Sequence, residues 1–165
     1  MNSIEIIDNF LEEEYFKGVL EYCLHSSYTY GEWDMNDTPP TGMVREIGKK
    51  EKIYKLLSSQ IKKVYPQVRK LNLDRMYVNC FAPSENPYFH TDGDDGVTVL
   101  YYVNDHWVPN DGGETQILVK DSGGINEIKG ILPLPNRIIC FDATFLHRAT
   151  SFRSKHRFTL AAKFS

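Results

Sequence analysis

The sequence lacks a strong excess of charge of either sign, and this absence limits the classes of partner. Its 19 lysine and arginine residues stand against 22 acidic residues, which gives a formal net charge of -3 and a pI near 5.9. Domains that bind nucleic acid are usually basic, with lysine and arginine gathered on one face. We therefore expect no nucleic-acid partner.

Long apolar runs and paired cysteines are also missing. No stretch approaches the roughly 20 apolar residues of a membrane-spanning helix, and the opening MNSIEIIDNF has no basic segment ahead of an apolar one. Cys23, Cys80 and Cys140 are far apart and form no CxxC pair, so we interpret them as free thiols buried in apolar sequence. We expect a cytoplasmic protein without a membrane anchor.

The sequence does contain enough apolar and aromatic material for one ordinary folded domain. With 165 residues, 41% of them hydrophobic and 13% aromatic, the chain is long enough to form a sizeable core. No internal repeat or low-complexity segment divides it. We predict a single domain over residues 1–165, with helical support at about 8–66 and a β core at about 70–164.

Two helices are predicted in the first part of the chain. Acidic residues at positions 12–14 suit the positive end of a helix, and Leu11, Tyr15, Val19 and Cys23 then recur every four residues as a buried face. A second helix is predicted at about 50–65, with an apolar stripe, solvated lysines and a stop at Pro66. The segment between them, YTYGEWDMNDTPPTGMVREIG, is either a lid or binding loop or a plain connector.

After Leu71 the pattern changes to short runs rich in β-branched and aromatic residues. These runs are RMYVNCF, VTVLYYV, ETQILV, NRIICF and FTLAAKF, separated by Gly, Pro, Asn and Asp. Five or more short strands that follow two helices predict a β-sandwich or small barrel braced by helices. We expect the chemistry to lie in this β part.

The stretch FHTDGDDG contains the first candidate metal ligands, His90 and Asp92. At the end of a strand, residues two apart project on the same side, so both side chains can reach one point while Thr91 points away. The spacing alone does not distinguish ligands from polar residues of a turn. The acidic residues that follow do not form a calcium loop, because Gly96 and Val103 stand where an EF-hand needs ligands.

A third ligand has to come from elsewhere in the fold. His25 at the end of the first helix and His106 in a turn are more simply surface residues or caps, whereas His147 borders an aromatic-rich strand where a polar ring needs a partner. His147 is therefore the best third ligand, and a core histidine bonded to backbone is the alternative. Two imidazoles and one carboxylate suit either a non-haem Fe(II) oxygenase or a zinc hydrolase.

Arg157 favours the oxygenase over the hydrolase. It lies ten residues after His147 at the start of RFTLAAKF, and Thr159 shares its face of that strand. A guanidinium grips a carboxylate with two hydrogen bonds, and a dicarboxylic cosubstrate needs such a clamp. Tyr102, ten residues after Asp92, can add a phenolic donor. The alternatives are a surface ion pair for Arg157 and core packing for Tyr102.

With these residues in place, the chain resembles the 2-oxoglutarate- and Fe(II)-dependent dioxygenases, and in particular their prolyl 4-hydroxylase branch. The resemblance covers roughly residues 70 to 164 and is carried in order by FHTDGDDGVTVLYYVNDHW, GGETQI, PLPNRIICFDATFLHRAT and RFTLAAKF. The pieces HTD, LYYVNDHW and GGE resemble the catalytic core of the hypoxia-factor prolyl hydroxylases. IEIIDNFLEEEYF resembles the first strand and helix of the family.

This resemblance implies a double-stranded β-helix, the cupin-like jelly roll, with Fe(II) on His90, Asp92 and His147. It also implies that Arg157 binds the distal carboxylate of 2-oxoglutarate with help from the side chains of Tyr102 and Thr159. The oxidant is then O2, and ascorbate is a candidate accessory cofactor.

The activity implied by the resemblance is hydroxylation of a C–H bond, with succinate and CO2 as co-products. The expected substrate is a prolyl residue of a peptide or protein, and a free amino acid or other small molecule is the alternative. A non-catalytic metal-binding jelly-roll module is a further alternative. A nucleic-acid demethylase is disfavoured by the acidic charge and by the short spacing from His147 to Arg157.

The sequence departs from the family pattern in two places. Phe81 stands where hypoxia-factor relatives have a tyrosine that faces the cosubstrate, although Tyr77 is nearby. The sequence also ends at Ser165, directly after the last expected strand, so we expect no C-terminal helix of the kind that helps some relatives to hold peptides. The loop from Tyr28 to Met43 is expected to shape the substrate entrance.

Overall fold

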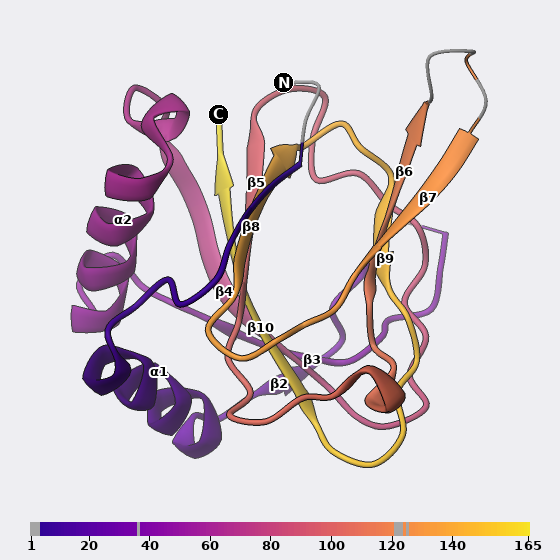
Figure 1. The fold of residues 1–165 in the computed structure, drawn as a ribbon, viewed down its shortest axis with the longest axis horizontal. Helices are drawn as coiled ribbons and strands as arrows, with labels where there is room; N and C mark the ends of the chain where they lie inside the picture. Colours follow the sequence, from indigo (N-terminus) through magenta and orange to yellow (C-terminus); the bar gives the residue numbers. More distant parts are fainter. Residues whose placement is uncertain (1–3, 36, 121–123, 125) are drawn as a thin grey trace.

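Two sheets face each other in the computed structural model, and two helices cover the outer side of the larger sheet (Figure 1). The structure describes residues 4–35, 37–120, 124 and 126–165; the remaining positions of the predicted domain lie outside the described residues. The helices are α1 (Glu13–His25) and α2 (Lys52–Val64), with short 3-10 helices η1 (Pro66–Val68) and η2 (Pro109–Asp111). No helix in this described part is long and apolar enough to cross a membrane.

Both sheets are antiparallel throughout their paired strands. The seven-stranded sheet contains, in spatial order, β1 (Glu5–Ile7), β8 (Ile138–Asp142), β5 (Val97–Tyr102), β10 (Arg157–Phe164), β4 (Leu73–Phe81), β3 (Met43–Glu46) and β2 (Thr29–Tyr30). The three-stranded sheet contains β7 (Asn126–Ile131), β6 (Thr115–Lys120) and β9 (His147–Ala149). From β5 onward the chain passes repeatedly between the two sheets, which confirms the predicted double-stranded β-helix.

Residues of the larger sheet alternate between two environments, as the period of a strand requires. On β10, Phe158, Leu160 and Ala162 belong to the core beneath the helices. Ala161 packs with Tyr102, from β5, in a second cluster that faces the smaller sheet. The same strands therefore hold the helices on one side and line the space between the sheets on the other.

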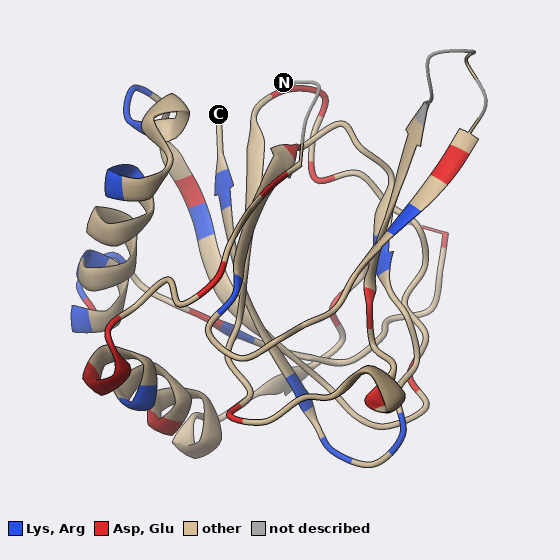
Figure 2. Cartoon of the chain, in the orientation of Figure 1, with Lys and Arg blue, Asp and Glu red and all other residues tan. Residues whose placement is uncertain are grey.

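The two predicted helices form, with small differences in extent. Val19 and Cys23 are buried on α1 as expected, but Tyr15 is 45% exposed and lies in a shallow groove between α1 and α2. On α2, Leu57 and Ile61 are fully buried, while lysines cover the outward face (Figure 2). All three cysteines are buried and free, as predicted.

The sequence patterns missed several short strands. The presumed loop before α2 contributes β2 and β3, which pair with each other, and β3 extends the larger sheet by pairing with β4. Strand β7 was missed because all of its residues except Ile131 are exposed, so it has no apolar alternation to detect. Tyr30 and Glu46, at the ends of β2 and β3, are exposed in the same way.

Candidate metal centre and carboxylate clamp

Backbone pairing brings the first two predicted ligands next to the third. The His90 N–H donates to the His147 carbonyl at 3.1 Å, and the His147 N–H donates back to the His90 carbonyl at 2.9 Å. The Asp92 N–H donates to the Ala143 carbonyl at 2.9 Å, just before β9. Thr91 between them is exposed, as the alternation predicts.

The side chains of His90, Asp92 and His147 converge on one point. One ligand atom from each lies within 4.8 Å of the others, and no second group of three or more ligating side chains of this kind occurs among the described residues. The His90 Nε2 is 3.7 Å from Asp92 Oδ1, and the His147 Nε2 is 3.5 Å from Asp92 Oδ2. Atoms that share a cation at about 2 Å each are separated by such distances.

The Nδ1 atoms of both imidazoles, which face away from the convergence point, are within hydrogen-bond distance of backbone carbonyls. His90 Nδ1 lies 3.0 Å from the Tyr88 carbonyl, and His147 Nδ1 lies 2.9 Å from the Phe145 carbonyl. A carbonyl only accepts, so each Nδ1 carries the proton and each Nε2 keeps its lone pair toward the convergence point. This second layer fixes the tautomer that binds a metal.

Electrostatics favour the metal-binding protonation states. Burial lowers the pKa of His147 to about 4, despite the neighbouring Asp92 carboxylate, so the ring is neutral near pH 7. Burial opposes ionisation of Asp92, but the His147 ring, the Lys163 ammonium and the Thr98 hydroxyl together outweigh it, and the pKa of Asp92 lies below its ordinary value. The triad therefore presents a neutral His147 imidazole beside an ionised Asp92 carboxylate.

Asp92 has one engaged oxygen and one available oxygen. The Thr98 hydroxyl donates to Oδ2 at 2.6 Å. Oδ1 forms an ion pair with Lys163 Nζ at 2.8 Å and accepts no hydrogen bond from the described residues. Because His90 Nε2 lies beside Oδ1 and His147 Nε2 beside Oδ2, this buried carboxylate fits a cation.

The loop at 31–42 is tied to this centre. The Asp34 side chain is 5% exposed, and its Oδ1 lies 3.4 Å from His90 Nδ1. Its Oδ2 accepts from the Tyr88 N–H at 2.8 Å and from the Thr41 hydroxyl at 3.0 Å. Glu32, also in this loop, forms a two-pronged ion pair with Arg75 of β4 at 2.9 and 3.1 Å. These contacts favour the binding-loop interpretation over a plain connector.

Arg157 lies deep between the sheets at the other end of the same cavity. It is 2% exposed and forms no ion pair within the described ranges. Its Nε donates to the Gly113 carbonyl at 3.0 Å, Nη1 to the Thr159 hydroxyl at 2.6 Å and Nη2 to the Thr115 hydroxyl at 2.9 Å. Burial lowers its pKa, but the ordinary value is so high that the guanidinium stays charged.

Gly113 and Thr115 come from the turn that enters β6. Gly113 has a φ of +75° and a Cβ there would approach Trp107 to 2.9 Å, so only glycine places this carbonyl against Arg157 comfortably. Gly112, in the same turn, also has a positive φ, of +77°. The turn thus orients the guanidinium without neutralising it.

A buried, unneutralised guanidinium is a fitting receptor for a carboxylate. A buried charge is unfavourable unless it is paired, and neutral hydroxyls and a carbonyl leave the positive charge uncompensated. Arg157, Thr159 and the triad all line one cavity between the sheets. A dicarboxylic 2-oxo acid can therefore reach a cation at one end and a guanidinium at the other.

Tyr102 lies next to the clamp, in contact with Thr115 and close to Arg157. Its hydroxyl is fully buried and donates to Thr115 at 2.8 Å, and Arg157 lies 5.4 Å from the ring centroid. Burial raises the pKa of Tyr102, so the phenol stays protonated. In this arrangement Tyr102 supports the clamp through Thr115; whether it also contacts the cosubstrate stays a prediction.

The remaining histidines lie apart from the centre. His25, His106 and His156 are exposed, and His25 ends α1 as expected. The sequence analysis missed Thr98, Lys163, Asp34 and Thr115, which support the triad and the clamp. Of these, Lys163 carried a detectable signal, because it lies on the same face of β10 as Arg157 and Thr159, which were already assigned.

Residues 76–164 match the family model of the 2OG-Fe(II) oxygenase superfamily. The chain belongs to this superfamily. It is an Fe(II)- and 2-oxoglutarate-dependent oxygenase, which decides between the iron and zinc enzymes that the ligand set alone left open. No curated protein sequence matches this oxygenase.

The fold of this oxygenase is shared with solved prolyl hydroxylases. A Trichoplax adhaerens prolyl hydroxylase, in complex with a hypoxia inducible factor peptide fragment, is 22% identical with a TM-score of 0.82, covering 99% of this chain and 84% of that one. A Pseudomonas putida prolyl-4-hydroxylase is 14% identical with a TM-score of 0.73, covering 99% and 92%. A viral collagen prolyl hydroxylase from Paramecium Bursaria Chlorella virus-1, in a 2OG complex, is 15% identical with a TM-score of 0.71, covering 98% and 94%.

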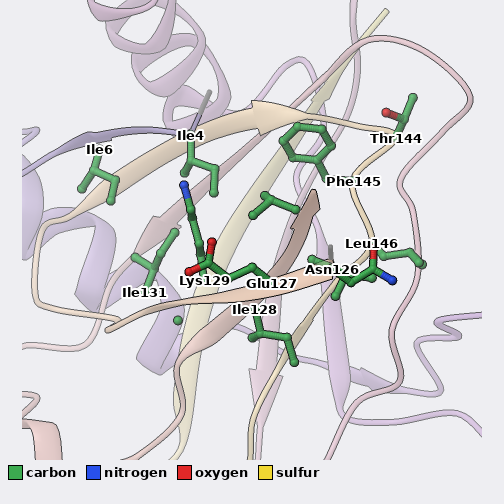
Figure 3. Close-up of a pocket in the computed structure, with 13 residues that line it drawn as sticks. Ile4, Ile6, Asn126, Glu127, Ile128, Lys129, Ile131, Thr144, Phe145 and Leu146 are labelled. Atoms are coloured by element: carbon green, nitrogen blue, oxygen red, sulfur yellow. The ribbon is translucent and has the colours of Figure 1, made fainter. Parts of the chain in front are cut away.

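A separate hollow of this oxygenase lies between β1, β7 and the segment before β9 (Figure 3). Its lining includes four isoleucines and two leucines, together with Phe145, Glu127 and Lys129. None of the predicted site residues lines it. The candidate site is therefore the narrower cavity that joins the triad to Arg157.

Proposed function

We propose that this oxygenase hydroxylates a prolyl residue of a peptide or protein, with succinate and CO2 as co-products. His90, Asp92 and His147 hold Fe(II), and Arg157 binds the distal carboxylate of 2-oxoglutarate. The bound iron and 2-oxoglutarate supply the oxidising chemistry with O2. The protein orients these groups and excludes water from the space between the sheets.

Each residue of the cavity has a distinct task in this proposal. The Nδ1–carbonyl bonds keep the Nε2 lone pairs of His90 and His147 directed at the metal. Thr98 holds one oxygen of Asp92 and leaves the other for coordination. Thr159 and Thr115 accept hydrogen bonds from the guanidinium of Arg157 and so fix its orientation. Both partners are neutral, so the positive charge is left for the carboxylate of the cosubstrate.

The observation that carries the choice of a peptide substrate is an apolar rim beside the cavity. We define the rim as four exposed large side chains: Tyr30, Trp33, Met35 and Tyr88. Glu32 and Asp34, which flank Trp33, line the cavity, and the Asp34–Tyr88 bond joins the two segments that carry the rim. Aromatic surfaces of this kind receive proline-containing segments, whose backbone is already restricted in the free state.

Peptide hydroxylation is tested by incubating the protein with Fe(II), 2-oxoglutarate, O2 and a panel of proline-containing peptides, with and without ascorbate. Mass spectrometry is expected to find a gain of one oxygen atom on proline, with one succinate formed for each hydroxylation. Free proline and other free amino acids form the second arm of the panel. Oxygen gain in that arm alone would reject the peptide and establish the small-molecule alternative.

The rim supplies a matched variant for this assay. Trp33→Ala is expected to raise the KM for the peptide while the KM for 2-oxoglutarate stays unchanged, because Trp33 is exposed and does not line the cavity. Tyr15→Ala, which removes an exposed aromatic ring from α1, is the control and is expected to change neither. A protein that forms no succinate from 2-oxoglutarate under air, with or without peptides, would instead be the non-catalytic metal-binding module.

A further inference from the structure

Two buried side-chain oxygens lack a hydrogen-bond partner among the described residues: Asp92 Oδ1 and Asn79 Oδ1. Both residues line the cavity that joins the triad to Arg157. The position of Asp92 Oδ1 is explained by the metal centre. No contact explains Asn79, whose side-chain amide forms no hydrogen bond within the described part of the chain.

A buried side-chain oxygen without a hydrogen-bond partner, such as Asn79 Oδ1, is an unusual feature of a folded protein. Leaving such a group unpaired is unfavourable, and most buried polar side chains find a partner in the protein or in a bound molecule. Asn79 lies on β4, on the inward face that it shares with Tyr77 and Phe81. A group that pairs with this end of the side chain would therefore lie in the cavity between the sheets.

The strand register locates Asn79 beside Thr159 of the clamp, one inward step from Arg157 toward Lys163. On β10, Arg157 pairs with Phe81, Thr159 with Asn79, and Ala161 with Tyr77. One further inward step along β10 reaches Lys163, whose Nζ is 2.8 Å from Asp92 Oδ1. Because each inward step advances about 7 Å, a molecule that extends from Arg157 to the triad passes over the level of Asn79.

We propose that Asn79 is a further cosubstrate-binding residue, whose side-chain amide donates to the carboxylate at the metal end of the bound 2-oxo acid. Rotation of the terminal torsion exchanges Oδ1 and Nδ2, so the amide can offer a donor where an anion is bound. This assignment rests on the proposed function, because it uses the 2-oxo acid held by Arg157.

Phe81 gives this role a chemical reason. It stands one inward step from Asn79 on β4, at the position where the sequence resemblance places a tyrosine that faces the cosubstrate. Phenylalanine provides no hydroxyl at this position of the cavity wall. The amide of Asn79 offers a donor on the same face of the same strand.

The test measures ligand binding, without turnover, on protein loaded with Mn(II). Calorimetric titration with 2-oxoglutarate is expected to give a Kd at least about tenfold higher for Asn79→Ala, since a hydrogen bond to a charged group is lost. Asn79→Asp is expected to weaken binding further, because it places a carboxylate against a carboxylate. Asn72→Asp makes the same change at an exposed position and is expected to bind 2-oxoglutarate like the wild type.

A second ligand distinguishes the two ends of the cosubstrate. 2-Oxovalerate has the same 2-oxo acid end but lacks the distal carboxylate. Asn79→Ala is expected to weaken both ligands by a similar factor, whereas Arg157→Gln is expected to weaken only 2-oxoglutarate. A loss in Asn79→Ala that is confined to 2-oxoglutarate would assign the amide to the distal carboxylate and overturn the proposal.

The unfolding temperature of the Asn79→Ala protein tests whether Asn79 has a purely structural role. Alanine removes an unpaired amide, so the metal-free Asn79→Ala protein is expected to unfold at a temperature no lower than the wild type, with unchanged Mn(II) affinity. A lower unfolding temperature with a wild-type Kd for 2-oxoglutarate would show that the amide has a structural partner, and the proposal would fail. If the wild type itself binds no 2-oxo acid, the proposed function fails rather than the role of Asn79.

Discussion

The two faces of the larger sheet are made by the same strands but have different chemistry. Toward the helices, β10 presents Phe158, Leu160, Ala162 and Phe164, all of them in one apolar core. Toward the smaller sheet, the same strand presents Arg157, Thr159 and Lys163, which hold the clamp and contact the triad. Neighbouring residues therefore serve stability and chemistry separately, and single substitutions can test this division.

The largest effect is expected from removal of a triad ligand on the inner side. Asp92→Ala is expected to reduce Fe(II)-dependent succinate formation by more than about 100-fold. Substitution of a residue that only supports a metal ligand costs up to about 100-fold, and loss of a direct ligand is expected to cost more. The fold is expected to persist, because Asp92 lies outside both apolar clusters. Near-ultraviolet circular dichroism and a succinate assay provide the measurements.

Asp94→Ala is the matched control for the triad, since Asp94 is exposed two residues further along the same loop. It is expected to behave like the wild type in both measurements. His90→Ala is expected to repeat the loss seen with Asp92→Ala. Undiminished turnover in either triad variant would refute the ligand assignment.

On the helix side, Leu160→Ala is expected to lower the free energy of unfolding by about 2–5 kcal/mol, because it leaves a cavity in a packed core. Leu160 is 1% exposed. The KM for 2-oxoglutarate is expected to stay within about twofold, although Thr159 and Ala161 on either side face the cavity. Denaturant titration measures the stability; Leu24→Ala, at an exposed position of α1, is the control and is expected to have little effect.

A pH effect of up to about 3 kcal/mol is expected from His147, whose folded-state pKa is about 4 against an ordinary value of 6.5. Because the folded state holds this ring neutral, the stabilisation is complete above pH 6.5 and is lost as the pH falls toward 4. Denaturant titrations of the metal-free protein across this range measure it. His147→Gln is expected to show a shallower fall, and an identical pH profile would mean that another group is responsible.

The smallest of these effects concerns the clamp. Arg157→Ala removes a charge-assisted contact worth about 1.5–3 kcal/mol, so the KM for 2-oxoglutarate is expected to rise roughly 10- to 100-fold. Steady-state kinetics with varied 2-oxoglutarate measure the change. Arg153→Ala, at an exposed position of the preceding turn, is the control. An unchanged KM in Arg157→Ala would mean that another residue holds the distal carboxylate.

Buried and exposed elements also differ in how well they could be predicted from the sequence. Apolar periodicity was enough to predict α1, α2 and the long inner strands, because burial imposes a regular pattern on both. It missed β2 and β7, whose residues are largely exposed and therefore carry no such pattern. The binding-loop interpretation of residues 28–43 depended on contacts such as Asp34 with His90, which no local pattern encodes.

The candidate site was predicted from residue type, strand spacing and the resemblance to the dioxygenase family. His90, Asp92 and His147 come together as the alternation and the need for a third ligand suggested, and Thr159 contacts Arg157 as expected for two residues on one face. The hydrogen bond from Tyr102 to Thr115 could not be predicted from the sequence, because it depends on how the two sheets pack. The unpaired state of Asn79 is likewise a property of the assembled cavity.

The central claim is that one cation is bound by two imidazoles and one carboxylate at the end of the cavity that contains Arg157. A crystal structure of the Mn(II)-loaded protein with 2-oxoglutarate, with the metal located by anomalous diffraction, tests it most directly. The account predicts a single anomalous peak about 2.0–2.2 Å from His90 Nε2, His147 Nε2 and an oxygen of Asp92, with Arg157 on the distal carboxylate. A metal bound elsewhere, or a peak that lacks any one of these three ligands, would contradict it.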